Sequence, residues 1–466
     1  MLKNIWMWIL NKIFKVPTET KQKELEDNQK YAVQYEAIDS INFNSIFSNK
    51  LANYTISDSN LNITGGETKT KDKDGKEITV TNSNPRTELL NKTGQSMWKK
   101  AKKITSMAFG YGGVFLFPYV KGNKLFYNLI PQGRVTIDKT EGDLITGATA
   151  LAEKKEITKG IGQTKTYIRW ANYRLEANQD GTYNGVIEQK FSDETGKEIP
   201  APDFWKNILL KLTIQNVDRA LLGYVKSPIN NRKTNDKYGV PITYGCDSII
   251  AEIKETMKQM LDEFRAKKTF IGIDITMFDK NDKLPDTGIF KKFLFDDKDK
   301  KFEVYDPAFR SYTERLQELY RRLEDAIGTS RGIISDVQTQ NATATEIKRS
   351  MYDTFTIVDD MRSNIEKGLE DFFYACNVLA NAFNLSPQGE YKISFEWSYS
   401  LLEDTQAEFS QMMQAESKGI VSKVEIRQWM NPDETLEESE QAIQKIKEEN
   451  PDIDDILGTK PKNNEE

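Results

Sequence analysis

The strongest pattern of apolar and polar positions lies between residues 306 and 328. Asp306 is a typical helix-capping residue, and Pro307 has the fixed φ that suits the first turn of a helix. Apolar residues then recur every three or four positions: Phe309, Tyr312, Leu316, Leu319, Tyr320, Leu323 and Ile327. This spacing predicts a helix with one apolar face, which ends at Gly328.

A longer helical pattern follows after the polar residues 329–342, which include few apolar side chains to anchor them. Thr343 and Glu346 form a capping box, in which each side chain can bond a free backbone N–H of the other residue. Apolar positions then continue at helical spacing to Phe383. They predict one helix of roughly 60 Å at 1.5 Å per residue. This length is more typical of an assembly than of a compact active site.

The remaining patterns predict a mixed α+β chain. At 466 residues it should divide into two to four domains. Helical spacing is expected over 18–60, 91–109, 247–267, 403–416, 423–429 and 434–449. Strands are expected as a hairpin in 61–83, as short strands from a glycine turn at 110–113 to about residue 200, in a charged segment at 269–305, and at 391–399. Residues 226–243 are expected to be an irregular linker.

Charge is unevenly distributed along the chain. The net charge is −6, which argues against tight binding of nucleic-acid phosphates. Residues 433–466 contain 12 acidic residues and 4 lysines, so the rest of the chain carries about +2. The helices expected over 247–268 and 306–327 are almost neutral, and neutral helices beside DNA would hold it weakly.

The chain has no histidine, which excludes Ser-His-Asp, Cys-His and HExxH chemistry. Its two cysteines, Cys246 and Cys376, are far apart and form no CxxC pair. They predict buried reduced thiols in a reducing compartment rather than a disulfide framework or a zinc site. No cofactor or metal is expected.

One catalytic motif matches by sequence alone. Residues 328–332 read Gly-Thr-Ser-Arg-Gly and fit GxSxG, with Ser330 as the nucleophile. That motif requires a preceding strand, a following helix and a histidine, whereas here a helix precedes and a loop follows. The pattern therefore favours a turn over a hydrolase.

Residues 1–30 contain an amphipathic helical pattern with lysines and two tryptophans. The apolar run is too short to span a bilayer, and no cleavage site of a signal peptide follows it. An arm that docks on a neighbouring protein is favoured over a helix that lies on a membrane surface.

Eight short segments and the order of the predicted elements carry a resemblance to a known family. The segments are residues 331–335, 344–348, 395–397, 403–404, 412–416, 418–422, 425–429 and 435–438. With them, the chain resembles the portal proteins of tailed phages, of the type found in siphophages of Gram-positive bacteria. The resemblance covers nearly the whole chain, but no single motif is diagnostic, and residues 61–83 and 176–205 match no named part.

The resemblance implies a portal fold with distinct regions: an N-terminal arm at 1–30, an α+β wing at 31–243, a first stem helix at 244–268, a β-rich clip at 269–305, a second stem helix at 306–328, a tunnel loop at 329–342, the rest of the wing with a long spine helix at 343–400, and a helical crown with an acidic tail at 401–466. It also implies a ring, usually of twelve subunits, and no enzymatic activity.

The resemblance further implies which residues meet partners. The DNA-facing residues of the tunnel loop would be Thr329, Ser330, Arg331, Ser335, Asp336, Gln338, Thr339, Gln340 and Asn341. The clip residues that face terminase and then head–tail connectors would be Lys280, Lys283, Asp296, Asp297 and Asp299. Double-stranded DNA, the major capsid and scaffold proteins and head–tail adaptors would be the other partners. The protein would be found at the portal vertex of the virion, and in the host cytoplasm during assembly.

Two other interpretations remain open from the sequence. One is another non-enzymatic virion or head-morphogenesis protein of a phage, which shares the long helices but forms no open ring. The other is a hydrolase without histidine that uses Ser330 or a pair of carboxylates.

Overall fold

The structure is a computed structural model that describes residues 19–37, 41–71, 77–81, 83–142, 144–158, 164–232, 237–266, 270–274, 290–293, 302–305, 309–336, 351–398, 412–431 and 434–449. The chain divides into two compact units. The first comprises residues 1–341 with 349–397, and the second comprises residues 342–348 with 398–466.

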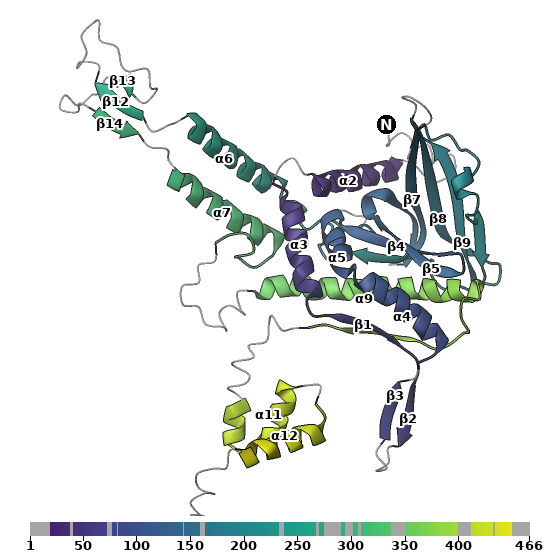
Figure 1. Ribbon diagram of the computed structural model, residues 1–466. Coiled ribbons are helices and arrows are strands. Elements are labelled where there is room, and N and C mark those ends of the chain that lie inside the picture. The colour runs from purple at the N-terminus through teal and green to yellow at the C-terminus, as the bar shows by residue number, and fades with distance from the viewer. Residues whose placement is uncertain are drawn as a thin grey trace, which may run out of the picture. The chain divides into compact units, whose positions relative to one another are not determined.

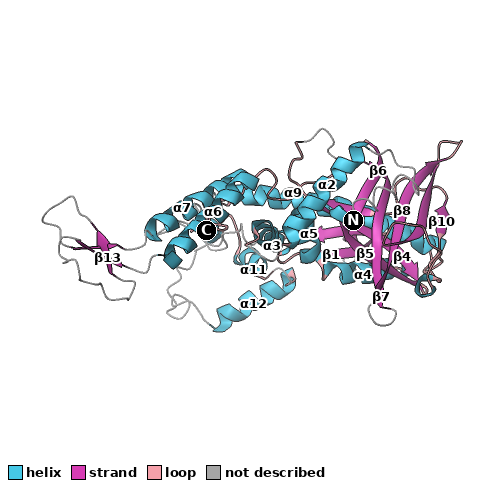
Figure 2. Ribbon diagram, turned by 90° about the horizontal axis from the view of Figure 1, so that it is seen from above, coloured by secondary structure: helices cyan, strands magenta, loops and turns pink. Residues whose placement is uncertain are grey.

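The largest β layer of the first unit is a five-stranded antiparallel sheet with the strand order β10-β9-β8-β7-β6 (Figures 1 and 2). Its strands are β6 (Val135–Glu141), β7 (Leu144–Thr158), β8 (Thr164–Ala177), β9 (Tyr183–Asp193) and β10 (Lys211–Ile214). The expectation of short strands is wrong here, because β7, β8 and β9 contain 15, 14 and 11 residues. Pairing across two neighbours stabilises β7 and β8 over this length.

A three-stranded sheet with the order β11-β4-β5 lies next to it in the same unit. Its strands are β4 (Gly113–Lys121), β5 (Lys124–Pro131) and β11 (Gly223–Lys226). Gly112 has a φ of +87°, which ends the preceding helix and allows the turn into β4. The strand predicted after this glycine turn is confirmed.

β4 separates two hydrophobic clusters, because alternate side chains of a strand point to opposite faces of its sheet. Val114 and Leu116 belong to a cluster formed mainly by helices. Phe115 and Phe117 belong to a second cluster with the five-stranded sheet. Because both faces of β4 are covered, its first residues form a continuous apolar run without alternation.

Four helices of the first unit precede these strands. They are α2 (Glu19–Glu36), α3 (Phe43–Ile56), α4 (Pro85–Trp98) and α5 (Ala101–Tyr111). The prediction of a single helix over 91–109 is wrong, because the chain turns at Lys99 and Lys100. There the Lys100 N–H bonds the Met97 carbonyl, three residues back, at 2.8 Å instead of continuing the helical pattern.

Helix α9 (Tyr352–Ala382) crosses the three-stranded sheet (Figure 1). It is shorter than the helix expected over 343–383. It begins at Tyr352, with Met351 as its N-cap residue, and residues 337–350, including the predicted capping box, lie outside the described residues. Its 31 residues still extend over about 46 Å at 1.5 Å per residue.

The charged β-rich segment predicted between two helices is confirmed in its described strands. α6 (Asp247–Ala266) precedes it and α7 (Phe309–Ile327) follows it. Between them, β12 (Phe270–Asp274) pairs in parallel with β13 (Phe290–Phe293) and antiparallel with β14 (Phe302–Tyr305). The hairpin predicted in 61–83 is also confirmed as β2 (Glu67–Lys71) and β3 (Glu77–Thr81), while β1 (Asn60–Thr64) pairs with β15 (Lys392–Glu396).

The second unit contains a short helix at 412–417, α11 (Lys423–Met430) and α12 (Leu436–Glu449). A capping box of Ser422 and Glu425 begins α11. Arg427 makes two bonds of 2.8 Å to the carboxylate of Glu434, and these bonds connect α11 to the segment before α12. Local capping and this ion pair therefore organise the described part of a unit in which few of the described apolar side chains are buried.

Both cysteines are buried and free, as the sequence predicts. Burial raises the pKa of Cys246 to about 11 and raises that of Cys376 well above its usual range. Among the described residues, no helix is long and apolar enough to cross a bilayer. The arm predicted over residues 1–30 falls mostly outside the described residues.

Two glycines allow α9 to approach β11 closely. Gly368 faces β11, and a Cβ built on it would lie 2.7 Å from both the Tyr224 carbonyl oxygen and the Val225 Cγ2. Gly223 on β11 faces the backbone of α9 in the same way. The helix and the strand therefore pack backbone against backbone.

We expect Gly368→Ala to lower the free energy of unfolding by about 1–3 kcal/mol, since the added methyl group displaces a packed strand. Chemical denaturation followed by circular dichroism measures this change. Ser363→Ala, at an exposed position of the same helix, is the matched control and should change stability by less than about 0.5 kcal/mol. Equal stability of the Gly368 variant and the wild type would contradict the close packing.

Candidate functional site

Helices α6 and α7 lie side by side, and the chain runs along them in opposite directions (Figure 1). The apolar face predicted for α7 is confirmed at its inner end, because Leu316, Leu319, Leu323 and Ile327 are buried in the helical cluster. On α6, Ile253 is completely buried in the same cluster. This packing fixes the inner ends of both helices to the rest of the first unit.

The exposed surfaces of these helices carry both acidic and basic residues, and several of them form ion pairs. An ion pair joins Arg315 on α7 to Glu252 on α6. Within α7, Arg310 pairs with Glu314 and Arg322 pairs with Glu318, each at 2.9 Å and four residues apart. Such exposed pairs add little stability, but they cancel charge locally.

α7 ends in a Schellman motif around Gly328, which has a φ of +83°. The Thr329 N–H bonds the Glu324 carbonyl at 3.0 Å, and the Gly328 N–H bonds the Asp325 carbonyl at 3.2 Å. Glycine suits this position because its φ lies in the left-handed region. The end of the helix predicted at Gly328 is confirmed.

The side chain of Glu324 fixes the residues that follow the helix. It is completely buried, and its carboxylate accepts bonds from the backbone N–H groups of Gly332 at 3.3 Å, Ile334 at 2.5 Å and Ser335 at 3.0 Å. It also accepts a bond of 2.6 Å from the Ser335 hydroxyl. A buried carboxylate is tolerated only when its oxygens are satisfied in this way.

Further contacts connect the same segment to neighbouring helices. The Ser330 N–H donates to the Thr354 hydroxyl at 2.9 Å, and the Thr354 N–H donates to the Ser330 hydroxyl at 3.3 Å, which joins the segment to α9. The Lys50 amino group on α3 donates to the Ile333 carbonyl. These contacts hold residues 329–336 between α3, α7 and α9, and we call this segment the α7 junction.

A surface ion pair lies at the edge of the α7 junction. Arg331 donates to both carboxylate oxygens of Asp325, at 3.0 and 2.8 Å. These bonds lower the pKa of Asp325 below its usual range. The charge of Arg331 is therefore partly neutralised by a fixed acid of α7.

The expectation that residues 329–342 have few apolar anchors understates the α7 junction, because Ile333 is buried in the helical cluster. Of the residues predicted to face DNA, Thr329, Ser330 and Ser335 have buried side chains, while Arg331 and Asp336 are exposed. Those predicted farther along, together with the predicted clip residues, lie outside the described residues: Gln338, Thr339, Gln340, Asn341, Lys280, Lys283, Asp296, Asp297 and Asp299.

Comparison with known families identifies the chain. A family model described as "Phage portal protein, SPP1 Gp6-like" matches residues 20–455. The chain belongs to this family of phage portal proteins. No curated protein matches it. The family match agrees with the resemblance seen in the sequence, and it covers both units of the portal protein.

The sequence reasoning missed Glu324, the central residue of the α7 junction. One signal was present, since Glu324 lies four residues after Tyr320 and three before Ile327, on the side of the apolar stripe. An acidic residue at the edge of an apolar helix face, one turn before a glycine stop, is consistent with a carboxylate that caps the following turn. The donors themselves are backbone groups, which a residue pattern does not reveal.

We expect Glu324→Gln to destabilise the portal protein by about 1–3 kcal/mol, because the amide nitrogen cannot accept the bonds that a carboxylate oxygen accepts. Denaturant titration measures the loss. The matched control is Glu318→Gln on the exposed surface of α7, which should change stability by less than about 0.5 kcal/mol. Equal effects of the two substitutions would show that the buried carboxylate does not organise the junction.

Proposed function

We propose that copies of this chain close into a ring at one vertex of a phage capsid, and that double-stranded DNA enters and leaves through the bore. Membership of the portal family over residues 20–455 is the observation that carries this proposal. The family is one of structural proteins, so no catalytic step is assigned to the chain.

In this proposal, α6 and α7 are the stem helices beside the passage. Acidic and basic side chains on these two helices form ion pairs, so the helices would present little net charge to passing phosphates. Fewer contacts with phosphates would let the DNA slide more easily. Leu261 and Phe264 on α6 are 44% and 63% exposed in the single chain. Apolar side chains at these positions support contact with a neighbouring subunit.

The tunnel loop is proposed to extend from the α7 junction toward DNA. Residues 329–336 form its fixed base, with Arg331 and Asp336 as the exposed polar side chains that can meet DNA. The remaining contacts are assigned to residues 338–341. The buried Thr329, Ser330 and Ser335 act in this proposal as anchors of the loop, because little of each residue is exposed to solvent.

The clip is proposed to comprise residues 269–305 and to dock the terminase first and the head–tail connectors later. The small sheet of β12, β13 and β14 supports a compact module at this place in the chain. The wing would comprise residues 31–243 and 343–400, and the crown residues 401–466. The assembled ring, of twelve subunits by analogy with the family, would also contact major capsid and scaffold proteins and reside in the virion.

The two competing functions have weaker support. A hydrolase that uses Ser330 is disfavoured, because this side chain is buried and its hydroxyl accepts a bond from the Thr354 N–H. A virion protein without an open ring remains the second candidate, and particle imaging distinguishes it from the portal ring.

Imaging of the purified full-length protein by negative-stain electron microscopy tests the proposal. We expect annular particles with a central hole. A variant that lacks residues 337–341 but keeps the α7 junction should form the same rings, because the deleted residues follow the anchored segment. In an infection or packaging assay the variant should lose DNA retention, since the loop no longer reaches the duplex.

The control for this experiment is Arg310→Gln on the exposed surface of α7, which should preserve both rings and packaging. Particles without a bore at every protein concentration would contradict the ring. Normal DNA retention by the shortened variant would contradict the role of the loop.

Charge reversal at Asp296, Asp297 and Asp299 tests the proposed clip. We expect the triple Asp→Lys variant to bind terminase at least roughly tenfold more weakly, because three acidic charges of the docking surface change sign. The ring should form normally, as mass photometry can measure. Reversal of three acids in the C-terminal segment, Asp452, Asp454 and Asp455, is the matched control. Unchanged terminase binding by the clip variant would remove these acids from the docking surface.

A further inference from the structure

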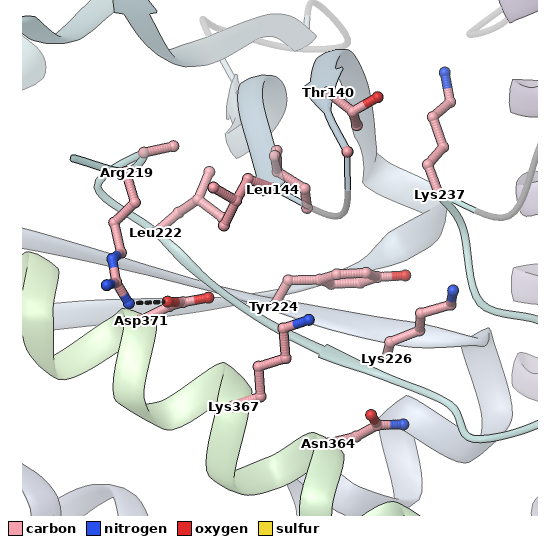
Figure 3. Close-up of a pocket in the computed structure, with 13 residues that line it drawn as sticks. Thr140, Leu144, Arg219, Leu222, Tyr224, Lys226, Lys237, Asn364, Lys367 and Asp371 are labelled. Carbon is pink, nitrogen blue, oxygen red and sulfur yellow. Dashed lines mark hydrogen bonds and ion pairs between the residues drawn. The ribbon is translucent and has the colours of Figure 1, made fainter. Parts of the chain in front are cut away.

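Two hollows in the described part of the first unit have different surroundings. One, of about 460 Å³, lies where α9 and β11 meet the turn between β6 and β7, and the ion pair of Arg219 with Asp371 forms part of its wall (Figure 3). The other, of about 730 Å³, is a groove between α6 and α7. This groove lies on the two proposed stem helices, where copies in a ring would have to pack against one another.

The groove between α6 and α7 is lined mainly by polar side chains. Its acids are Glu252 and Glu255 on α6, and Arg315 on α7 forms an ion pair with Glu252. The Gln259 amide donates a hydrogen bond of 3.2 Å to the Glu255 carboxylate, so the described partner of this acid is a neutral amide rather than a base. The negative charge of Glu255 can therefore meet a base on another molecule.

The opposite side of α6 combines apolar and basic side chains. Leu261 lies nine residues after Glu252, and at about 100° per residue these two positions are on opposite sides of the helix. Lys258 and Arg265 share the side of Leu261, being three residues before it and four residues after it, and both are exposed. Leu261 and Phe264 are 44% and 63% exposed. We call Lys258, Leu261, Phe264 and Arg265 the basic flank.

The basic flank and the groove are complementary rather than alike. The flank presents apolar side chains between two bases, and the groove is a hollow that contains acids. In a symmetric dimer the same patch meets itself, so the basic flank would face another basic flank. In a closed ring each copy contacts the next through two different patches. The two surfaces therefore fit head-to-tail contact between copies.

The positions along α6 also match. Copies related by the axis of a ring lie at equal height, and Lys258 is three residues from Glu255, a rise of about 4.5 Å that a flexible lysine side chain can span. Tyr312 lies farther out in the groove, where its hydroxyl bonds the Glu263 side chain. Glu263 is next to Phe264 in the chain, so an aromatic wall of the groove lies at the height of the apolar part of the basic flank.

We propose that the basic flank of one copy packs into the α6–α7 groove of the next copy in the ring. This contact rests on the proposed portal ring and assigns the two surfaces that meet at the stem. Lys258 pairs with Glu255 of the next copy, while Leu261 and Phe264 pack toward Tyr312 of the next copy. Burial of the exposed apolar side chains favours association, and the charge pair selects the orientation.

Exchange of the two charges in the full-length protein tests this contact. Lys258→Glu places acid against acid, and Glu255→Lys places base against base. We expect each variant alone to raise the protein concentration needed for ring formation at least roughly tenfold, as sedimentation velocity measures. The variant with both substitutions has an opposite pair at every interface and should assemble like the wild type.

An equimolar mixture of the two single variants distinguishes a contact between copies from one within α6. In an alternating ring, the substituted flank of one variant meets the substituted groove of the other, and the remaining interfaces keep the original pair. The mixture should therefore form rings with an even number of copies at concentrations where neither variant does so alone. Lys92→Glu, the same charge change at an exposed position of α4, is the matched control and should assemble like the wild type.

A neutral variant, Leu261→Ser, keeps the test independent of the charge changes. It should also raise the concentration needed for assembly, with an unchanged circular dichroism spectrum, because it removes apolar area only from the exposed flank.

Unchanged assembly of Lys258→Glu, Glu255→Lys and Leu261→Ser would overturn this contact, while rings of the wild type would leave the proposed function intact. Recovery in the doubly substituted variant but not in the mixture would place the charge pair within one helix, which also overturns the contact. Absence of rings from the wild type would contradict the proposed function and this contact together.

Discussion

The burial of α9 between two hydrophobic clusters is the constraint on which the first unit depends. Phe372 and Phe373 pack in the helical cluster, while Ala375 and Leu379 pack in the cluster of the five-stranded sheet. One helix therefore joins two cores that strand β4 otherwise separates. Burial of each Phe or Leu side chain contributes about 1.5–3 kcal/mol, so the position of α9 is strongly determined.

The α7 junction connects α9 to the segment from which the proposed tunnel loop extends. Thr354 near the start of α9 bonds Ser330, and Glu324 at the end of α7 bonds the backbone on the other side of the same turn. The turn is thus held from two helices whose own positions are set by apolar packing. The proposed tunnel loop would therefore start from a segment that is fixed to the core of the first unit.

The spacing of apolar residues predicted those helices and strands that bury only one face. The apolar stripe of α7, its glycine stop and the strands between α6 and α7 could all be predicted, since side-chain spacing reports directly on which face is buried. The lengths of β7 and β8 could not be predicted in this way. Their stability comes from pairing with neighbours distant in sequence, and polar residues such as Lys154 and Lys155 lie within β7.

The exposure of the candidate DNA-facing residues was harder to predict for a related reason. Arg331 and Asp336 were assigned to the loop, and both are exposed, but Ser330 and Ser335 were placed on the same surface and are buried. The Ser330 hydroxyl is hydrogen-bonded to α9 and the Ser335 hydroxyl to α7. The sequence does not show whether a polar side chain in a loop bonds to solvent or to another part of the protein. The start of α9 shows the same limit, because local capping signals at Thr343 and Glu346 do not define where the described helix begins.

The absence of histidine and the burial of both cysteines together limit which side chains can change charge near neutral pH. Histidine is the side chain whose ordinary pKa lies in the physiological range, and burial moves both cysteine pKa values upward, away from that range. Few side chains of this portal protein therefore have an ordinary pKa near neutrality, so its net charge changes little over the physiological pH range.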